Sequence, residues 1–256
     1  EGRLVSNTIF EIKMREQAFP KDFAVLYRTN AQSRSLEEAL RKQNIPYKIY
    51  GGLSFYQRKE IKDVLAYCRL TVNPNDEEAL KRVINYPARG IGNTTLQKLI
   101  ITANDNQISI WEVLNHLDKY NHNINKGSCI KLSNFTTLIN SYISQKDKYD
   151  SYYLAEHITK SSGLFNNLYN DKSPEGVSRF ENIQELLNGL KDFCENTNET
   201  KLANYMQDVA LLTNQDNEKT EDFNKVTLMT VHASKGLEFP YVFIVGLEQN
   251  LFPSMM

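Results

Sequence analysis

Cysteine is scarce in this sequence. Cys68, Cys129 and Cys194 are odd in number and widely spaced, which argues against a disulfide framework. Neither these residues nor the four scattered histidines have the spacing of metal ligands. We therefore expect a reducing, cytoplasmic location and no metal site.

Long apolar runs are also missing. The apolar stretch at residues 241–245 is far too short to cross a bilayer, and no basic start leads into an apolar segment. We therefore expect no membrane partner. With 256 residues, 41% of them hydrophobic, the chain can bury the core of one large domain or two.

A strong net charge is absent as well, since the total is −1. The charges are distributed unevenly: residues 28–62 carry eight Lys/Arg against three Glu, and residues 81–98 carry four basic residues and no acidic one. Residues 181–222 carry ten acids against three lysines. This pattern favours one face for a polyanion, with solvated helix faces as an equal alternative.

Apolar periodicity divides the chain into three parts. Helix and strand signals alternate in residues 1–73, which predicts a parallel sheet, and strand-like runs then disappear in residues 74–223. Two buried-strand patterns return in residues 224–256, at 226–230 and 241–245. The predicted fold class is α/β, a parallel-sheet domain interrupted by a large all-helical insertion. The sequence stops just after a strand pattern, so we expect a truncated domain.

The most specific segment is TVHASKGLEFP, residues 230–240, which lies between two predicted strands. Ligands bind at such strand ends in open α/β folds. Two further segments are DFAVLYRTNAQSR, residues 22–34, and PYKIYGGLSFYQRKEIKD, residues 46–63. The first delivers Tyr27 and Arg28 at a strand end, where a ring can stack on a base and a guanidinium can reach a phosphate.

A fourth segment, PARGIGNTTL at residues 87–96, has two glycines before a predicted helix start. Glycines let backbone N–H groups approach a phosphate, and the helix adds its positive end. A plain helix cap is the alternative. Taken in order, the four segments resemble the UvrD/PcrA/Rep group of superfamily 1 DNA helicases, with motif IV at residues 22–34 and motif V at residues 230–240.

The resemblance implies that residues 1–73 and 224–256 belong to the second RecA-like motor domain and that residues 74–223 are its helical insertion. No two glycines stand five apart, so no G-x-x-x-x-G-K-[ST] phosphate loop exists in the chain. A Walker B segment and motif VI are absent too. We expect ATP with Mg²⁺ as cofactor, the metal being held by the absent first motor domain, and no ATP hydrolysis by this chain alone.

The resemblance implies nucleotide-binding roles for four residues. The resemblance implies that Arg28 contacts the γ-phosphate as a catalytic arginine finger and that Tyr27 stacks on adenine. It places Lys235 near the ATP-binding cleft between the two motor domains. Glu238 would accept a hydrogen bond from the ribose. A core position is the equal alternative for Tyr27.

The DNA contacts implied by the resemblance fall into two groups. Thr230 and His232, with Arg58 as a weaker candidate, face single-stranded DNA; a structural loop histidine is the alternative for His232. The predicted duplex contacts are Arg89, Gly90, Gly92, Asn93 and Thr94.

The whole protein is thus expected to be an ATP-dependent 3′–5′ DNA helicase of repair or replication. Its expected partners are single-stranded and duplex DNA, with repair proteins besides. Two alternatives stay open: a DNA-binding or regulatory module without motor activity, and a subunit of a RecB/AddA-like helicase–nuclease.

Overall fold

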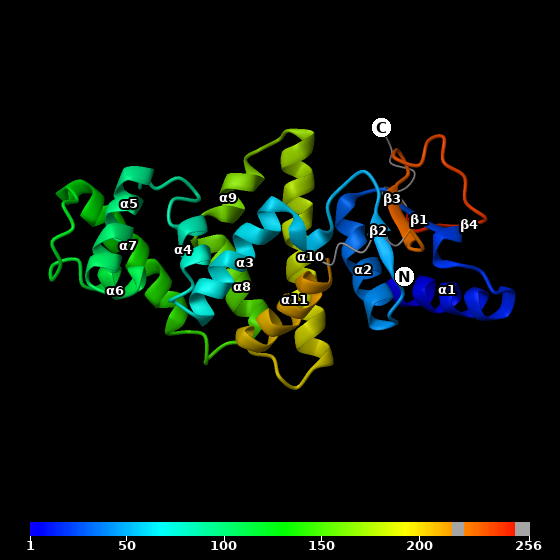
Figure 1. The fold of residues 1–256 in the computed structure, drawn as a ribbon, viewed down its shortest axis with the longest axis horizontal. Coiled ribbons are helices and arrows are strands. Elements are labelled where there is room, and N and C mark those ends of the chain that lie inside the picture. The colour runs from blue at the N-terminus through cyan, green and yellow to red at the C-terminus, as the bar shows by residue number, and fades with distance from the viewer. Residues whose placement is uncertain (217–222, 249–256) are drawn as a thin grey trace. The chain divides into compact units, whose positions relative to one another are not determined.

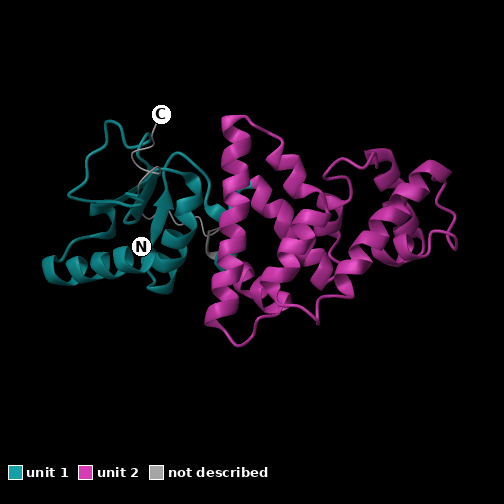
Figure 2. Ribbon diagram, turned by 180° about the vertical axis from the view of Figure 1, so that it is seen from behind, with its two compact units in different colours: residues 1–58, 212–256 teal, residues 59–211 magenta. Residues whose placement is uncertain are grey.

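The computed structural model describes residues 1–216 and 223–248, with the side chains of 214–216 left aside. The chain forms two compact units: residues 1–58 with 212–256, and residues 59–211 (Figure 2). The helical character of the second unit and the parallel sheet of the first confirm the predicted fold class (Figure 1).

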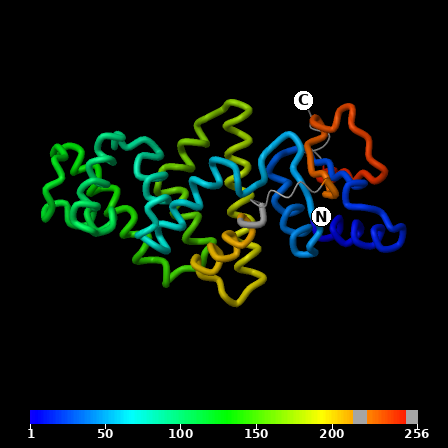
Figure 3. Tube along the Cα trace, in the orientation of Figure 1, coloured from blue at the N-terminus to red at the C-terminus, as the bar shows by residue number. Residues whose placement is uncertain are grey.

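The sheet unit contains a four-stranded parallel sheet in the order β2-β3-β1-β4. The Cα trace shows segments from the two ends of the chain, blue and orange, side by side in it (Figure 3). Strand β3 comes late in the sequence yet lies between β1 and β2, so the loops that follow these strands are neighbours. The elements are α1 (Gly2–Glu16), β1 (Phe23–Tyr27), α2 (Ser33–Lys42), β2 (Tyr47–Ile49), β3 (Val226–Thr230) and β4 (Tyr241–Ile244).

The core of this unit lies between the sheet and the helices α1 and α2. Val5 and Ile9 of α1 and Leu36 and Leu40 of α2 are all buried there. Helix α1 passes close to α2, since a Cβ on Gly2 would lie 2.4 Å from the backbone oxygen of Ser35. These contacts pack the two helices against each other and against the sheet.

The helical unit consists, in its described residues, of helices joined by turns and loops. Gly163, at φ +89°, starts the short helix α9. Trp111 is buried with Val113 and Leu114. The helices are α3 (Lys59–Val72), α4 (Glu77–Val83), α5 (Asn93–Asp105), α6 (Ile110–Asn115), α7 (Lys126–Ile143), α8 (Ser151–Ser161), α9 (Leu164–Tyr169), α10 (Pro174–Asn196) and α11 (Leu202–Asp216), whose last residues fall in the other unit.

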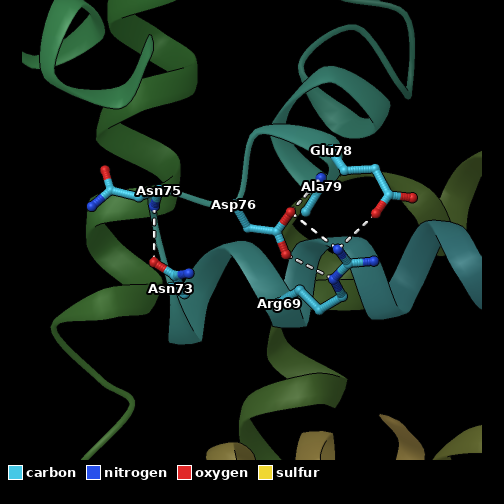
Figure 4. Close-up of polar contacts among 6 residues, drawn as sticks. All are labelled: Arg69, Asn73, Asn75, Asp76, Glu78 and Ala79. Atoms are coloured by element: carbon cyan, nitrogen blue, oxygen red, sulfur yellow. Dashed lines mark hydrogen bonds and ion pairs between the residues drawn. The ribbon is translucent and has the colours of Figure 1, made fainter. Parts of the chain in front are cut away.

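The link between α3 and α4 shows how local chemistry sets element ends (Figure 4). Helix α3 ends just before Asn73-Pro74, since proline disfavours helix in the preceding residue. Asp76 then caps α4 by accepting a hydrogen bond from the Ala79 N–H at 2.9 Å. The same carboxylate pairs with the Arg69 guanidinium at 2.8 and 3.1 Å. One side chain therefore both starts α4 and ties it to α3.

Candidate functional site

The carboxyl ends of the parallel strands meet at one edge of the sheet, and several predicted residues follow them. Arg28 comes directly after β1, and residues 231–236 form the turn after β3. The loop after β2 reaches the same place, since a Cβ on Gly51 would lie 3.6 Å from the Cβ of Ala233. In open α/β sheets this edge is where ligands bind.

Arg28 and His232 meet at this edge although 204 residues separate them in sequence. An Arg28 Nη1 lies 3.2 Å from His232 Nδ1. Because a guanidinium can only donate, Nδ1 accepts and the ring proton of a neutral imidazole sits on Nε2. Arg28 is half-buried and His232 exposed, so ligands can reach both. The structure thus joins a residue of motif IV to one of motif V.

The turn that presents Arg28 is held from inside by Gln32. Its Oε1 accepts hydrogen bonds from the backbone N–H groups of Arg28 and Thr29, each at 2.9 Å. Thr29 and Gln32 form a capping box around the short helical turn Asn30–Gln32. No role was predicted for Gln32, although the Thr-x-x-Gln spacing is the signal that could have found it.

Arg58, predicted as a weaker DNA contact, is 7% exposed and turned into the protein. Its guanidinium donates to the Asn30 carbonyl at 2.7 Å, to the Ser33 hydroxyl at 2.9 Å and to the Leu53 carbonyl at 3.4 Å. Arg58 therefore ties the turn after β1 to the loop after β2. A DNA contact by Arg58 stays a prediction that none of these bonds supports.

The turn after β3 exposes most of its polar side chains. Lys235 and Glu238 are exposed, whereas Thr230 is half-buried and its hydroxyl accepts from the Ala233 N–H at 3.3 Å. Gly236 has φ +83°, a left-handed conformation that glycine adopts without strain. The nucleotide and DNA roles predicted for these side chains stay predictions.

Tyr27 lies in the core of the sheet unit. Its ring is 1% exposed, and burial raises the pKa of its hydroxyl to about 12. This placement matches the alternative of a core tyrosine. Stacking on adenine requires that the ring become accessible when nucleotide binds.

In the helical unit, the predicted duplex-binding turn between α4 and α5 divides into an inward and an outward part. Arg89 points inward: it donates to the carbonyls of Val83, Pro87 and Ser162 at 3.0–3.1 Å. Its guanidinium also lies over the ring of Phe135, 5.5 Å from the centroid. Arg89 therefore fixes the turn to the surrounding helices.

The outward part consists of Gly90, Gly92, Asn93 and Thr94, all exposed. Gly90 has φ +68°, and Gly92 precedes α5 without a side-chain cap. The first N–H groups of an α-helix have no partner within the helix, so this start offers donors to a ligand. Lys131 of α7, which the sequence did not connect with this turn, places its Nζ 3.1 Å from the Gly90 carbonyl.

Neither a metal cluster nor a membrane span is found in the described part of the chain. Residues 1–216 and 223–248 hold no group of three or more His, Cys, Asp or Glu side chains arranged for a metal ion. Over the same residues, no helix combines the length and apolarity that crossing a bilayer demands.

Comparison with known proteins agrees with the motifs. The sequence is 43% identical over 235 residues to the ATP-dependent DNA helicase PcrA of Staphylococcus aureus (strain COL). It is 42% identical over 234 residues to the protein of the same name from Staphylococcus epidermidis (strain ATCC 12228 / FDA PCI 1200). Each match covers 91% of this chain and 32% of the relative, so the chain spans about a third of the length of these curated relatives. Residues 1–256 match the model of the UvrD-like helicase C-terminal domain, which confirms the predicted resemblance. The chain belongs to the UvrD-like helicase C-terminal domain family.

Proposed function

We propose that the chain is part of an ATP-dependent 3′–5′ DNA helicase that acts in DNA repair or replication. Residues 1–73 and 224–256 then belong to the second motor domain and residues 74–223 form its insertion, although α3 itself packs with the helical unit. The observation that carries this proposal is the meeting of Arg28 and His232 at the carboxyl edge of the sheet. Family membership and the similarity to PcrA support it.

On the nucleotide side, Arg28 supplies positive charge to the γ-phosphate of an ATP that a first motor domain binds. Glu238 accepts a hydrogen bond from the ribose, Lys235 lies near the phosphates, and Tyr27 stacks on adenine once its ring is accessible. Mg²⁺ belongs to the first motor domain and neutralises phosphate charge there. Half-exposure of Arg28 supports this arrangement, because the guanidinium can leave His232 for a phosphate.

On the DNA side, Thr230 and His232 contact the single strand. Gly92, Asn93 and Thr94 offer backbone N–H groups to duplex phosphates, and Lys131 adds a cation beside Gly90. Repair proteins as further partners and a cytoplasmic location stay predictions from the sequence.

The test is Arg28→Ala in the full-length protein. We expect nucleotide affinity to stay within several-fold while DNA-stimulated ATP hydrolysis slows by about 10³-fold, as loss of an arginine finger does. Arg15→Ala is the matched control, since Arg15 is an exposed arginine of the same unit that pairs with its neighbour Glu16. A decrease of less than about tenfold for Arg28→Ala would contradict the γ-phosphate role.

A further inference from the structure

The turn after β1 depends on two side chains, and the roles predicted from the motifs give neither of them the task of holding it. The first is Gln32, whose single amide oxygen accepts from the N–H groups of both Arg28 and Thr29 at 2.9 Å. These are the first two residues beyond β1, where ladder hydrogen bonds of the sheet no longer hold the backbone. Gln32 therefore replaces the sheet as the partner of the Arg28 backbone.

The second side chain is Arg58, which also bonds to this turn. It donates to the Asn30 carbonyl and to the Ser33 hydroxyl, the residues on either side of Ala31 and Gln32. At 7% exposure its charge is largely removed from water, which is tolerated because the guanidinium is hydrogen-bonded. Charge-assisted bonds of this kind are roughly twice as strong as neutral ones.

We propose that Gln32 and Arg58 are positioning residues that hold the turn of residues 28–33 so that the Arg28 guanidinium meets the γ-phosphate. This inference rests on the proposed function of Arg28. The direction of the Arg28 side chain follows from the backbone that Gln32 fixes, and its contact with His232 places the guanidinium at the carboxyl edge of the sheet. A displacement of about 1 Å at a reacting group can cost about 10²-fold in rate.

The experiment uses Gln32→Met in the full-length protein, because methionine keeps the length of the side chain but loses the amide acceptor. We expect kcat for DNA-stimulated ATP hydrolysis to fall by about 10- to 100-fold with KM for ATP within about twofold. Gln145→Met is the matched control: Gln145 is also half-buried and makes one side-chain bond to a backbone carbonyl, that of Ser141, but in the helical unit. Its kcat should equal that of the parent protein.

A double-variant comparison separates positioning from general loosening of the fold. If Gln32 acts through Arg28, Gln32→Met should change kcat by less than about twofold in an Arg28→Ala background. An equal loss in both backgrounds would overturn the proposal, as would an unchanged kcat or a raised KM at unchanged kcat. Should Gln32→Met fail to fold, Gln32→Asn, whose oxygen is one methylene too short, carries the same expectation.

The same series distinguishes failure of this inference from failure of the proposed function. If Arg28→Ala slows hydrolysis by about 10³-fold and Gln32→Met has no effect, only the positioning role is wrong. If Arg28→Ala itself has little effect, the γ-phosphate role falls, and the positioning role falls with it.

Discussion

Replacing Gly90 or Gly92 by alanine should have two different consequences, although the two residues stand in the same turn. Gly90 has φ +68°, and a Cβ there would lie 2.6 Å from Lys131 Nζ. Gly92 has φ −79°, which any residue adopts, and a Cβ there would meet nothing within 4 Å. Alanine is therefore strained at Gly90 and sterically permitted at Gly92.

The expected loss of stability follows from these angles. An L-residue in the left-handed region costs about 1–2 kcal/mol, so Gly90→Ala should lower the free energy of unfolding by that amount. It should also push Lys131 off the Gly90 carbonyl. Gly92→Ala should cost less than about 1 kcal/mol, because glycine is only a moderately better N-cap residue than alanine. Urea unfolding of this chain measures both changes.

The effects on duplex binding should have the opposite order, with Gly92→Ala weakening binding more than Gly90→Ala does. At Gly92 the added methyl group would occupy the open space where a phosphate approaches the free N–H groups of α5, so Gly92→Ala should weaken binding several-fold while leaving the fold intact. Parent binding should be independent of sequence, with dissociation constants on the order of 10⁻⁴–10⁻⁶ M or weaker. Lys131→Gln removes one positive charge and should reduce the steepness of log binding constant against log salt concentration by about 1.

Fluorescence anisotropy with duplex DNA at low and moderate salt is the assay, with circular dichroism as the check on folding. The double variant Gly90→Ala/Gly92→Ala should bind no duplex detectably. If folded Gly92→Ala binds duplex as well as the parent chain, the turn is only a helix cap and the reasoning is refuted.

Two further predictions concern the chain as a whole. The purified chain should release no phosphate from ATP with or without DNA, because it has no phosphate loop, and DNA-stimulated release free of contaminating ATPase would show this to be wrong. Asp76→Ala should lower the free energy of unfolding by about 1–2 kcal/mol through loss of the α4 cap. Asp76→Asn keeps a capping oxygen and should cost less. If urea unfolding gives equal losses for the two variants, the effect comes from the ion pair with Arg69 instead.

The strands could be predicted from the sequence because their apolar runs are short, rich in β-formers and bounded by turn residues. Their order could not. Strand β3 inserts between β1 and β2, and the resulting contact joins Arg28 to His232 across 204 residues. Periodicity reports which residues are buried but not which distant strand covers them.

Helix starts were harder to predict than helix interiors. Residues 180–193 carry the apolar spacing of a helix, but α10 begins at Pro174. Ser173 caps it by accepting from the Gly176 N–H at 3.0 Å, and proline occupies the first position. The first turns of α10 are largely polar and carry little apolar periodicity, so only the capping chemistry marks them.

Three arginines were predicted to contact a ligand, and the structure separates them by what their guanidinium groups already bind. Arg58 donates to two backbone carbonyls and a hydroxyl, and Arg89 donates to three carbonyls. Arg28 contacts one imidazole nitrogen and stays half-exposed. A sequence motif shows that an arginine stands at a position but not what it binds, because the five N–H donors of a guanidinium can bind loop carbonyls as well as phosphates. Removing Arg58 or Arg89 breaks several hydrogen bonds that hold loops to their surroundings, so either loss should lower stability. Removing Arg28 leaves no buried carbonyl unpaired in the described contacts, so loss of activity in Arg28→Ala at unchanged stability is the signature of a ligand-binding arginine.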